Sequence, residues 1–233
     1  MATAGRWLIG LTLLSIIGLG GCAGPSSEAA SASRSERLVE ESRLVLRDFL
    51  DDEQYQRMRV YVQNAYAIIV MPDLLKGGFL AGAESGTAIM LVRNPTTGGW
   101  GQPAFYDVYG GSLGLQFGVQ TSDVVLTIMN EGAVKQMVGS GFKIGADASV
   151  AAGRVGSTIG AATTTRFGED LYVFARSQGL FGGFAIDGSY IAAKDDWNAA
   201  YYGRPVQPWE VMSDFNVISG TEVASLHDAL TSF

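Results

Sequence analysis

The chain has 233 residues, of which 47% are hydrophobic and 17% charged, and these values are typical of a compact folded body with its own core. The 16 basic and 23 acidic side chains give a net charge of −7, which excludes a general electrostatic attraction for nucleic acid or anionic lipid. One cysteine excludes an internal disulfide, and one cysteine with one histidine excludes a zinc site built from several Cys and His ligands.

The N-terminal segment has the pattern of a bacterial export signal. Arg6 precedes an apolar run, Trp7 to Leu19, which is shorter than the roughly 20 residues that a membrane-spanning helix needs. The run closes with LGGC, ending at Cys22, which resembles the lipobox of bacterial lipoproteins, where the cysteine thiol becomes a thioether to diacylglycerol. We predict a signal peptide at 1–21 and lipid attachment at Cys22; an ordinary secretory signal is the alternative.

Acylation of Cys22 would anchor the chain in a membrane, because two or three acyl chains bind a bilayer far more tightly than one. Ala23 and not Asp follows the cysteine, which by resemblance to Gram-negative lipoproteins favours the periplasm-facing side of the outer membrane. Residues 22–34 are small and polar, and we expect a flexible tether there, followed by a single domain at 35–233.

The domain opens with helical patterns and continues with strands. Apolar residues at helical spacing predict one helix from Ser35, as N-cap, to about Leu50 and a second helix at 53–64. From Ala67 to Ala193 the pattern is mostly that of strands. Residues 112–120 and 142–150 each alternate between apolar and small or polar side chains, which predicts a strand in each segment.

The remaining elements complete a mixed fold. Residues 124–129 are apolar on both faces and predict a central strand, and Asn130 is a candidate cap for a short helix at 131–138. Late strands are expected at 171–177 and 182–193, and helical turns at 208–215 and 223–230. We therefore predict an α+β fold, with a curved, glycine-rich antiparallel sheet or partial barrel flanked by N-terminal and C-terminal helices.

The stretch KGGFLAGAESGTAIMLV, Lys76 to Val92, has three interpretations. A phosphate-binding P-loop needs a lysine after its glycines and then a helix, whereas here Lys76 comes first and strand-forming residues follow. A membrane span is excluded by Glu84 in the middle of the stretch. The remaining interpretation is that glycine, 31 of the 233 residues, lets a sheet bend sharply or lets another element approach its backbone.

Several long segments resemble the SYLF domain family. They are DLLKGGFLAGAESGTAIML, GGWGQPAFY, GGSLGLQFGVQTSDVVLTIMNEGAVKQMV, KIGADASVAAG and LYVFARSQGLFGGFAIDGSYI, and DDWNAAYYG at 195–203 resembles the usual close of bacterial members. The resemblance covers about 38–203 and leaves 204–233 as a C-terminal helical extension. It implies a lipid-binding, non-catalytic domain: eukaryotic relatives are phosphoinositide-associated modules, fungal ones are linked to actin regulation, and bacterial ones are typically exported lipoproteins.

The chain departs from the family pattern in two places. The first helix mixes acidic with basic side chains where eukaryotic members carry a basic amphipathic helix, so a phosphoinositide-type surface is not expected. The family's A-G-P-x-G reads AGRVG here, which places Arg154 at the proline position and removes a φ constraint. Actin is not expected as a partner, because an exported lipoprotein lies beyond the bacterial inner membrane.

Four cations are the candidate ligand-binding residues for a lipid headgroup: Lys76, Arg93, Lys143 and Arg154. Taken singly, each is more simply a solvated charge, and the four form a site only if they lie on one edge of the sheet. The expected partners are the membrane, through the acyl groups, and a phospholipid or another apolar ligand. The alternative is a structural or scaffolding envelope lipoprotein that binds a protein partner.

No catalytic residue, metal site or cofactor is predicted, and no nucleic-acid partner. His227 has no G-x-S-x-G serine to activate and is expected to be a solvated surface side chain. An all-oxygen cation site would need acids from separate strands without a loop signature: Glu84, Asp107, Asp123, Asp147 and Asp187. No feature of the sequence favours the paired carboxylates of a glycosidase. An enzyme is the third interpretation, after lipid binding and binding of a protein partner.

Overall fold

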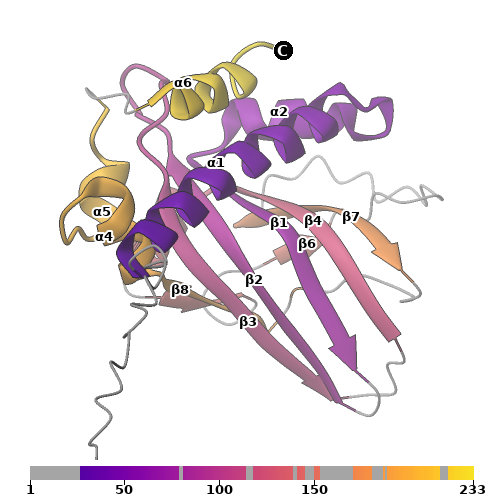
Figure 1. Ribbon diagram of the computed structural model, residues 1–233. Helices are drawn as coiled ribbons and strands as arrows, with labels where there is room; N and C mark the ends of the chain where they lie inside the picture. Colours follow the sequence, from indigo (N-terminus) through magenta and orange to yellow (C-terminus); the bar gives the residue numbers. More distant parts are fainter. Residues whose placement is uncertain are drawn as a thin grey trace, which may run out of the picture.

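The computed structural model describes residues 27–78, 81–113, 118–138, 141–144, 150–152, 170–179, 186, 188–215 and 220–233. These parts form an eight-stranded sheet with helices packed against it (Figure 1). The strands are β1 Ala67–Gly78, β2 Ala81–Val92, β3 Ala104–Leu113, β4 Gly118–Ile128, β5 Gly141–Lys143, β6 Val150–Ala152, β7 Leu171–Gly179 and β8 Tyr190–Ala193. The helices are α1 Ser27–Asp51, α2 Gln56–Asn64, α3 Glu131–Met137, α4 Asp195–Tyr202, α5 Pro208–Met212 and α6 Gly220–Ala229, with a 3₁₀ turn at Glu53–Tyr55.

The strand order is β5-β8-β3-β2-β1-β4-β7-β6, and neighbouring strands are antiparallel except for the parallel pair β6 and β7. The two edge strands, β5 and β6, are close in sequence: the chain from Lys143 to Val150 can span at most about 25 Å. A flat sheet with this many strands would be about 34 Å wide. The sheet must therefore be curved, which confirms the predicted curved sheet and the α+β fold.

Alternating side chains of the sheet enter two separate cores. On the helical face, sheet residues such as Ile68 and Phe105 pack under α1, α2 and α6, which lie across one end of β1–β4 (Figure 1). On the opposite face, called the inner face here, Met71 and Leu126 pack with α3 and α5. Because both faces are covered at this end, β4 is apolar on both sides there, as predicted for a central strand.

The first helix begins earlier than predicted. α1 starts at Ser27, and Ser35 is a buried residue within it, whose hydroxyl donates to the Ala32 carbonyl oxygen at 2.8 Å. Ser35 is therefore not the N-cap, and residues 27–34, expected as part of a flexible tether, are helical. Their alanines have the highest helix propensity of all residues, which the small-and-polar interpretation undervalued.

Two predicted strands are each divided between different places in the sheet. The alternation at 112–120 continues from β3 into β4, although β2 and β1 lie between these two strands. Likewise, 142–150 begins in β5 and ends in β6, at opposite edges, with 145–149 outside the described residues. The period of two in the sequence continues through 114–117 and 145–149, which lie outside the described residues, so it does not reveal where one strand ends.

The sequence patterns did not predict α4, although its signals are present. Asp195 and Asp196 lie in its first turn, where acidic side chains interact favourably with the positive end of the helix dipole. Gly203 follows the helix at φ +65°, the left-handed conformation that commonly ends a helix. The helix is fastened to β3 by the buried Asn198, whose side-chain amide donates to the Phe105 carbonyl oxygen and accepts from its N–H, both at 2.9 Å. Asn198 thus takes the place of a strand partner.

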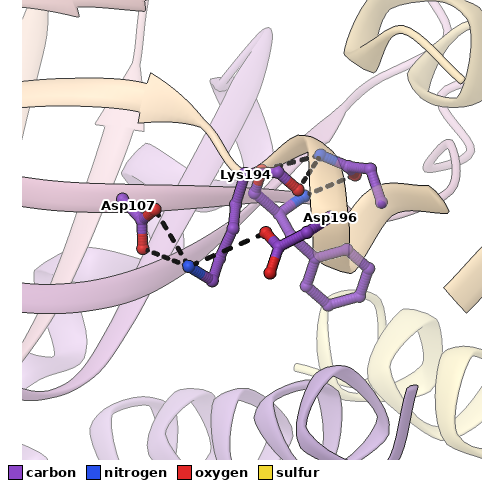
Figure 2. Close-up of polar contacts among 5 residues, drawn as sticks. Asp107, Lys194 and Asp196 are labelled. Atoms are coloured by element: carbon purple, nitrogen blue, oxygen red, sulfur yellow. Dashed lines mark hydrogen bonds and ion pairs between the residues drawn. The ribbon is translucent and has the colours of Figure 1, made fainter. Parts of the chain in front are cut away.

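A cation beside α4 adds a second link to β3. Figure 2 shows Asp107 and Asp196 directed toward the ammonium of Lys194, which lies 2.9 Å from Asp107 Oδ1 and 3.9 Å from Asp196 Oδ1. Lys194 also lies 5.1 Å from the centre of the Trp197 ring. The DDWN segment, singled out by the family resemblance, therefore holds α4 on the sheet.

Candidate functional site

Lys76, the first of the predicted ligand residues, forms an ion pair on the inner face. It is in register with Glu84 of β2, and its Nζ lies 2.8 Å from Glu84 Oε2, with side chains 11% and 10% exposed. The Glu84 carboxylate also accepts a hydrogen bond from Ser189 Oγ. Gly110 lies opposite Glu84, and a Cβ there would come within 2.7 Å of Glu84 Oε1. The glycine therefore leaves room for a largely buried ion pair.

A second polar group continues this row on the inner face. Gln120, in register with Lys76 on the other side, donates from Nε2 to Ser122 Oγ at 2.9 Å and to Ser177 Oγ at 2.8 Å. The two serine oxygens are 2.8 Å apart. In the part of the chain that is described, these groups form a partly buried polar network at the glycine-rich end of the sheet, whereas the other end of the inner face is apolar.

Arg93 follows β2, and its guanidinium donates mainly to backbone carbonyl groups. Its Nε donates to the Ala65 carbonyl at 3.0 Å, Nη2 to that of Val62 at 2.7 Å, and Nη1 to that of Gly98 at 3.0 Å. The guanidinium stacks 4.3 Å from the centre of the Trp100 ring, and burial lowers the pKa of Arg93. Arg93 thus donates to carbonyl groups at the C-terminal end of α2, where a helix runs short of backbone N–H donors.

The four predicted cations are not brought together where the structure describes them. Lys76 lies toward the far end of the β1–β2 pair, Arg93 follows the other end of β2, and Lys143 is exposed on the edge strand β5. Arg154 lies outside the described residues, as do Cys22 and the segment 1–21. Ligand binding by these residues stays a prediction.

A groove of about 280 Å³ lies between the end of β2, α3 and α5. Its apolar lining includes Val92, Pro95, Val134, Val138, Met212 and Phe215. Trp209 and Tyr66 also line it and are 55% and 41% exposed, whereas Val134 and Met212 are buried. No sequence pattern marks this groove, because its lining comes from segments far apart in the chain.

The groove also carries two opposite charges from one helix. Glu131 and Lys135 of α3 both line it, and Lys135 Nζ lies 2.8 Å from Glu131 Oε1. Their side chains are 63% and 73% exposed, and such pairs contribute only about 0.3–0.5 kcal/mol. The predicted Asn130 cap of this helix is confirmed, since Asn130 Oδ1 accepts from the Gly132 N–H at 2.7 Å. The site therefore combines an apolar cleft with a weakly bound charge pair.

The loop after β2 packs against α5, which contributes to the groove. A Cβ on Gly101 would lie 2.1 Å from the Met212 carbonyl oxygen, so glycine permits α5 to pack closely against this loop. His227 of α6 contacts the same loop, with Nε2 3.0 Å from the Gly101 carbonyl oxygen, and burial lowers the pKa of His227. His227 is therefore half-buried and hydrogen-bonded, and the expectation of a solvated surface histidine was wrong.

The acids considered for a cation site are separated. Asp107 pairs with Lys194 and Glu84 with Lys76, while Asp123 accepts from the Asp73 N–H at 3.2 Å. Burial raises the pKa of Asp123. Asp147 and Asp187 lie outside the described residues. Within the described ranges, no three His, Cys, Asp or Glu side chains are placed to hold a metal ion.

None of the described helices is both long enough and apolar enough to cross a membrane.

Comparison with known proteins places the domain in a family. Residues 109–233, which include α3, α5 and the groove residues that follow them, match the model of the Ysc84 family, described as Las17-binding protein actin regulator. SH3 domain-containing YSC84-like protein 1 of Xenopus laevis is 29% identical over 174 residues, covering 74% of this chain and 51% of the relative. Protein YSC84 of Saccharomyces cerevisiae is 29% identical over 166 residues, covering 68% and 35%.

A third relative, LAS seventeen-binding protein 3 of Saccharomyces cerevisiae, is 32% identical over 133 residues, covering 56% of this chain and 29% of the relative. The chain thus spans about half the length, or less, of the curated relatives it matches. The family description and the name of this yeast relative describe binding and regulation.

These names correct one prediction. Actin was not expected as a partner, but the family is described as a Las17-binding actin regulator and one yeast relative is named for Las17 binding. The exclusion was based on the inferred export signal and on no residue of the domain itself, and it was wrong. The resemblance seen in the sequence segments is confirmed over more than half of the chain, and the chain belongs to the Ysc84 family of SYLF domains.

Proposed function

We propose that this chain is a non-catalytic lipid-binding protein, anchored through Cys22 at the periplasmic side of an outer membrane. Its domain would bind the apolar part of a phospholipid. The observation that carries the proposal is the apolar groove between α3 and α5. The names of the relatives, which describe binding and regulation, support a non-catalytic role.

The groove has the character of a ligand site for two reasons. Its lining is mostly apolar with a small number of charged groups at hand, as is common in sites that bury a ligand. Trp209 also leaves more than half of its surface in solvent, although a tryptophan ring is among the side chains that gain most from burial. A hydrocarbon chain lying against Trp209 and Tyr66 would remove this apolar surface from water.

The proposed anchor would hold the domain near the bilayer. In this proposal residues 1–21 are removed as a signal peptide and Cys22 carries the acyl chains. Because α1 begins at Ser27, the link from Cys22 to the helix can extend at most about 18 Å. The groove would therefore act on lipids of the membrane that holds the anchor.

Vesicle co-sedimentation tests this function. The full chain carrying Cys22→Ser, which removes the acyl groups, should still sediment with phospholipid vesicles. Adding Trp209→Ala should weaken vesicle binding roughly tenfold, equivalent to about 1.4 kcal/mol, because the exposed ring would lose its contact with hydrocarbon. Val60→Ala is a matched control, since Val60 is 50% exposed on α2, away from the groove, and should leave binding unchanged.

The leader segment is common to all of these variants, so the comparison among them isolates the groove. If the Cys22→Ser chain binds no phospholipid vesicle, or if Trp209→Ala and Val60→Ala bind equally well, the groove does not bind lipid.

Protein binding is the second candidate function, either to an actin-related partner, as the family description suggests, or to an envelope protein in a scaffolding role. Co-sedimentation of the Cys22→Ser chain with filamentous actin provides the test for the first of these partners. Saturable binding of actin without any binding of vesicles would favour this function over lipid binding.

A further inference from the structure

The groove carries one positive and one negative side chain from the same helix, and we propose that this pair selects a zwitterionic phospholipid headgroup. Lys135 would bind the phosphate, Glu131 would bind the ammonium or trimethylammonium group, and an acyl chain would occupy the apolar groove. This inference rests on the proposed lipid-binding function and names the class of lipid.

The geometry of α3 brings the two charges to the hydrocarbon site. Glu131 and Lys135 are one helical turn apart, and Val134 and Val138 of the same segment also line the groove. A lipid whose chain lies along these valines would therefore have its headgroup near both charges. The charges of the headgroup and of the groove are complementary. The ligand carries a phosphate and an ammonium joined by a short linker, and the groove presents Lys135 and Glu131 one helical turn apart.

The existing ion pair between Glu131 and Lys135 would not prevent the two side chains from binding a headgroup instead of each other. Both side chains are more than 60% exposed, so water already competes for them and their mutual attraction contributes little to stability. A zwitterionic headgroup satisfies both charges at once, so neither is left without a partner when the pair opens. A headgroup with only negative charge would pair with Lys135 but would bring its anion close to Glu131.

The remaining charges nearby do not favour an anionic headgroup. Arg93 also lines the groove, but its Nε, Nη1 and Nη2 all donate to backbone carbonyl groups, and its ring contact is with Trp100. The net charge of the chain is −7, which repels an anionic bilayer at long range. Trp209 is 55% exposed, and a quaternary ammonium is attracted to the face of a tryptophan ring.

Headgroup selectivity is measured with the full chain carrying Cys22→Ser and vesicles that share the same acyl chains. Phosphatidylcholine vesicles, and vesicles of phosphatidylcholine with phosphatidylethanolamine, should bind at least about tenfold more tightly than phosphatidylglycerol vesicles. Glu131→Lys should abolish this preference by raising phosphatidylglycerol binding and lowering phosphatidylcholine binding. Glu41→Lys makes the same change of charge at an exposed site on α1 and should leave the preference intact.

The double variant Glu131→Lys with Lys135→Glu separates headgroup recognition from a simple change of charge. It restores one positive and one negative side chain, and phosphatidylcholine binding should return to within about threefold of the parent. Circular dichroism of each variant checks that α3 and the fold persist.

Equal binding to all vesicle types, or equal effects of Glu131→Lys and Glu41→Lys, would overturn the headgroup assignment while leaving lipid binding itself in place. Binding to no vesicle type would instead refute the lipid-binding function on which the assignment depends.

Discussion

Glu84 is held on the inner face by three neighbours that differ in kind: the ammonium of Lys76, the hydroxyl of Ser189 and the bare backbone of Gly110. A carboxylate this far from solvent is tolerated because a cation and a hydroxyl satisfy it. Removing only one member of such a pair leaves a buried charge without compensation. Lys76 and Glu84 can therefore be replaced only together without leaving such a charge. Position 110 requires glycine because a Cβ there would clash with the Glu84 side chain on the adjacent strand.

Substitution of Gly110 tests this constraint directly. Gly110→Ala should destabilise the fold by about 1–3 kcal/mol, because its Cβ would meet a glutamate that Lys76 and Ser189 hold in place. The neighbouring Gly111→Ala serves as control: its Cβ would find only an ordinary contact, 3.6 Å from the Gly82 carbonyl oxygen, and stability should change by less than about 0.5 kcal/mol. Urea denaturation measures both, and equal losses would contradict the explanation.

His227 makes the stability depend on pH. Burial lowers its pKa in the folded state below the unfolded value of about 6.5. The contribution of neutral His227 is therefore present above the unfolded pKa and is lost as the pH falls through the folded pKa. Unfolding free energies between pH 8 and pH 4 should fall more steeply for the parent than for His227→Gln, which does not titrate. Parallel curves would show that protonation of His227 has no such effect.

At the scale of elements, α4 shows how one side chain can attach a helix to a sheet. Asn198 bonds to both backbone groups of Phe105 and also donates to the Lys194 carbonyl oxygen at 3.0 Å, while Lys194 reaches across to Asp107. An amide side chain can donate and accept at once, as the backbone of a neighbouring strand would. The connection between β8 and α4 is therefore fixed by specific polar contacts as well as by apolar packing.

Asn198→Asp should destabilise the fold by roughly 3 kcal/mol or more, because it removes the donor to Phe105 and buries a charge. Asn64→Asp is the matched control, since Asn64 is exposed at the end of α2 and donates only to the Val60 carbonyl oxygen within its own helix. Its loss should stay below about 1 kcal/mol. Thermal or urea unfolding decides between them, and a small loss for Asn198→Asp would mean that apolar contacts alone hold α4.

At the scale of the whole molecule, the curl of the sheet and the groove have a common origin. Because β5 and β6 lie at opposite edges and are joined by a short segment, the sheet wraps around the inner core that contains α3 and α5. The helices α1, α2 and α6 occupy the opposite face (Figure 1), and none of their residues lines the groove. The tests of lipid binding and of headgroup selectivity both address this arrangement.

Local patterns were enough for the elements whose causes are local. The α3 helix was predictable with its cap, because Asn130 bonds to the N–H of Gly132, two residues further on. The central strand β4 was predictable because both of its faces are apolar, and α+β character followed from the order of such segments. Family membership was also readable, because long segments agree with the SYLF pattern in order and spacing.

Other features depend on contacts between distant parts of the chain, and only the tertiary structure decided them. In the sequence Lys76 has the pattern of a solvated cation, whereas in the structure Glu84 of β2 lies beside it. Likewise His227 was expected to be solvated, whereas its Nε2 lies 3.0 Å from the Gly101 carbonyl oxygen. The groove joins Tyr66, Val134 and Trp209, which have no shared period. By itself the sequence determined the types of most elements, the family and the expected export signal, because these are written in neighbouring residues. Strand order, charge pairing and the groove arise from the packing of remote segments, which no local pattern encodes.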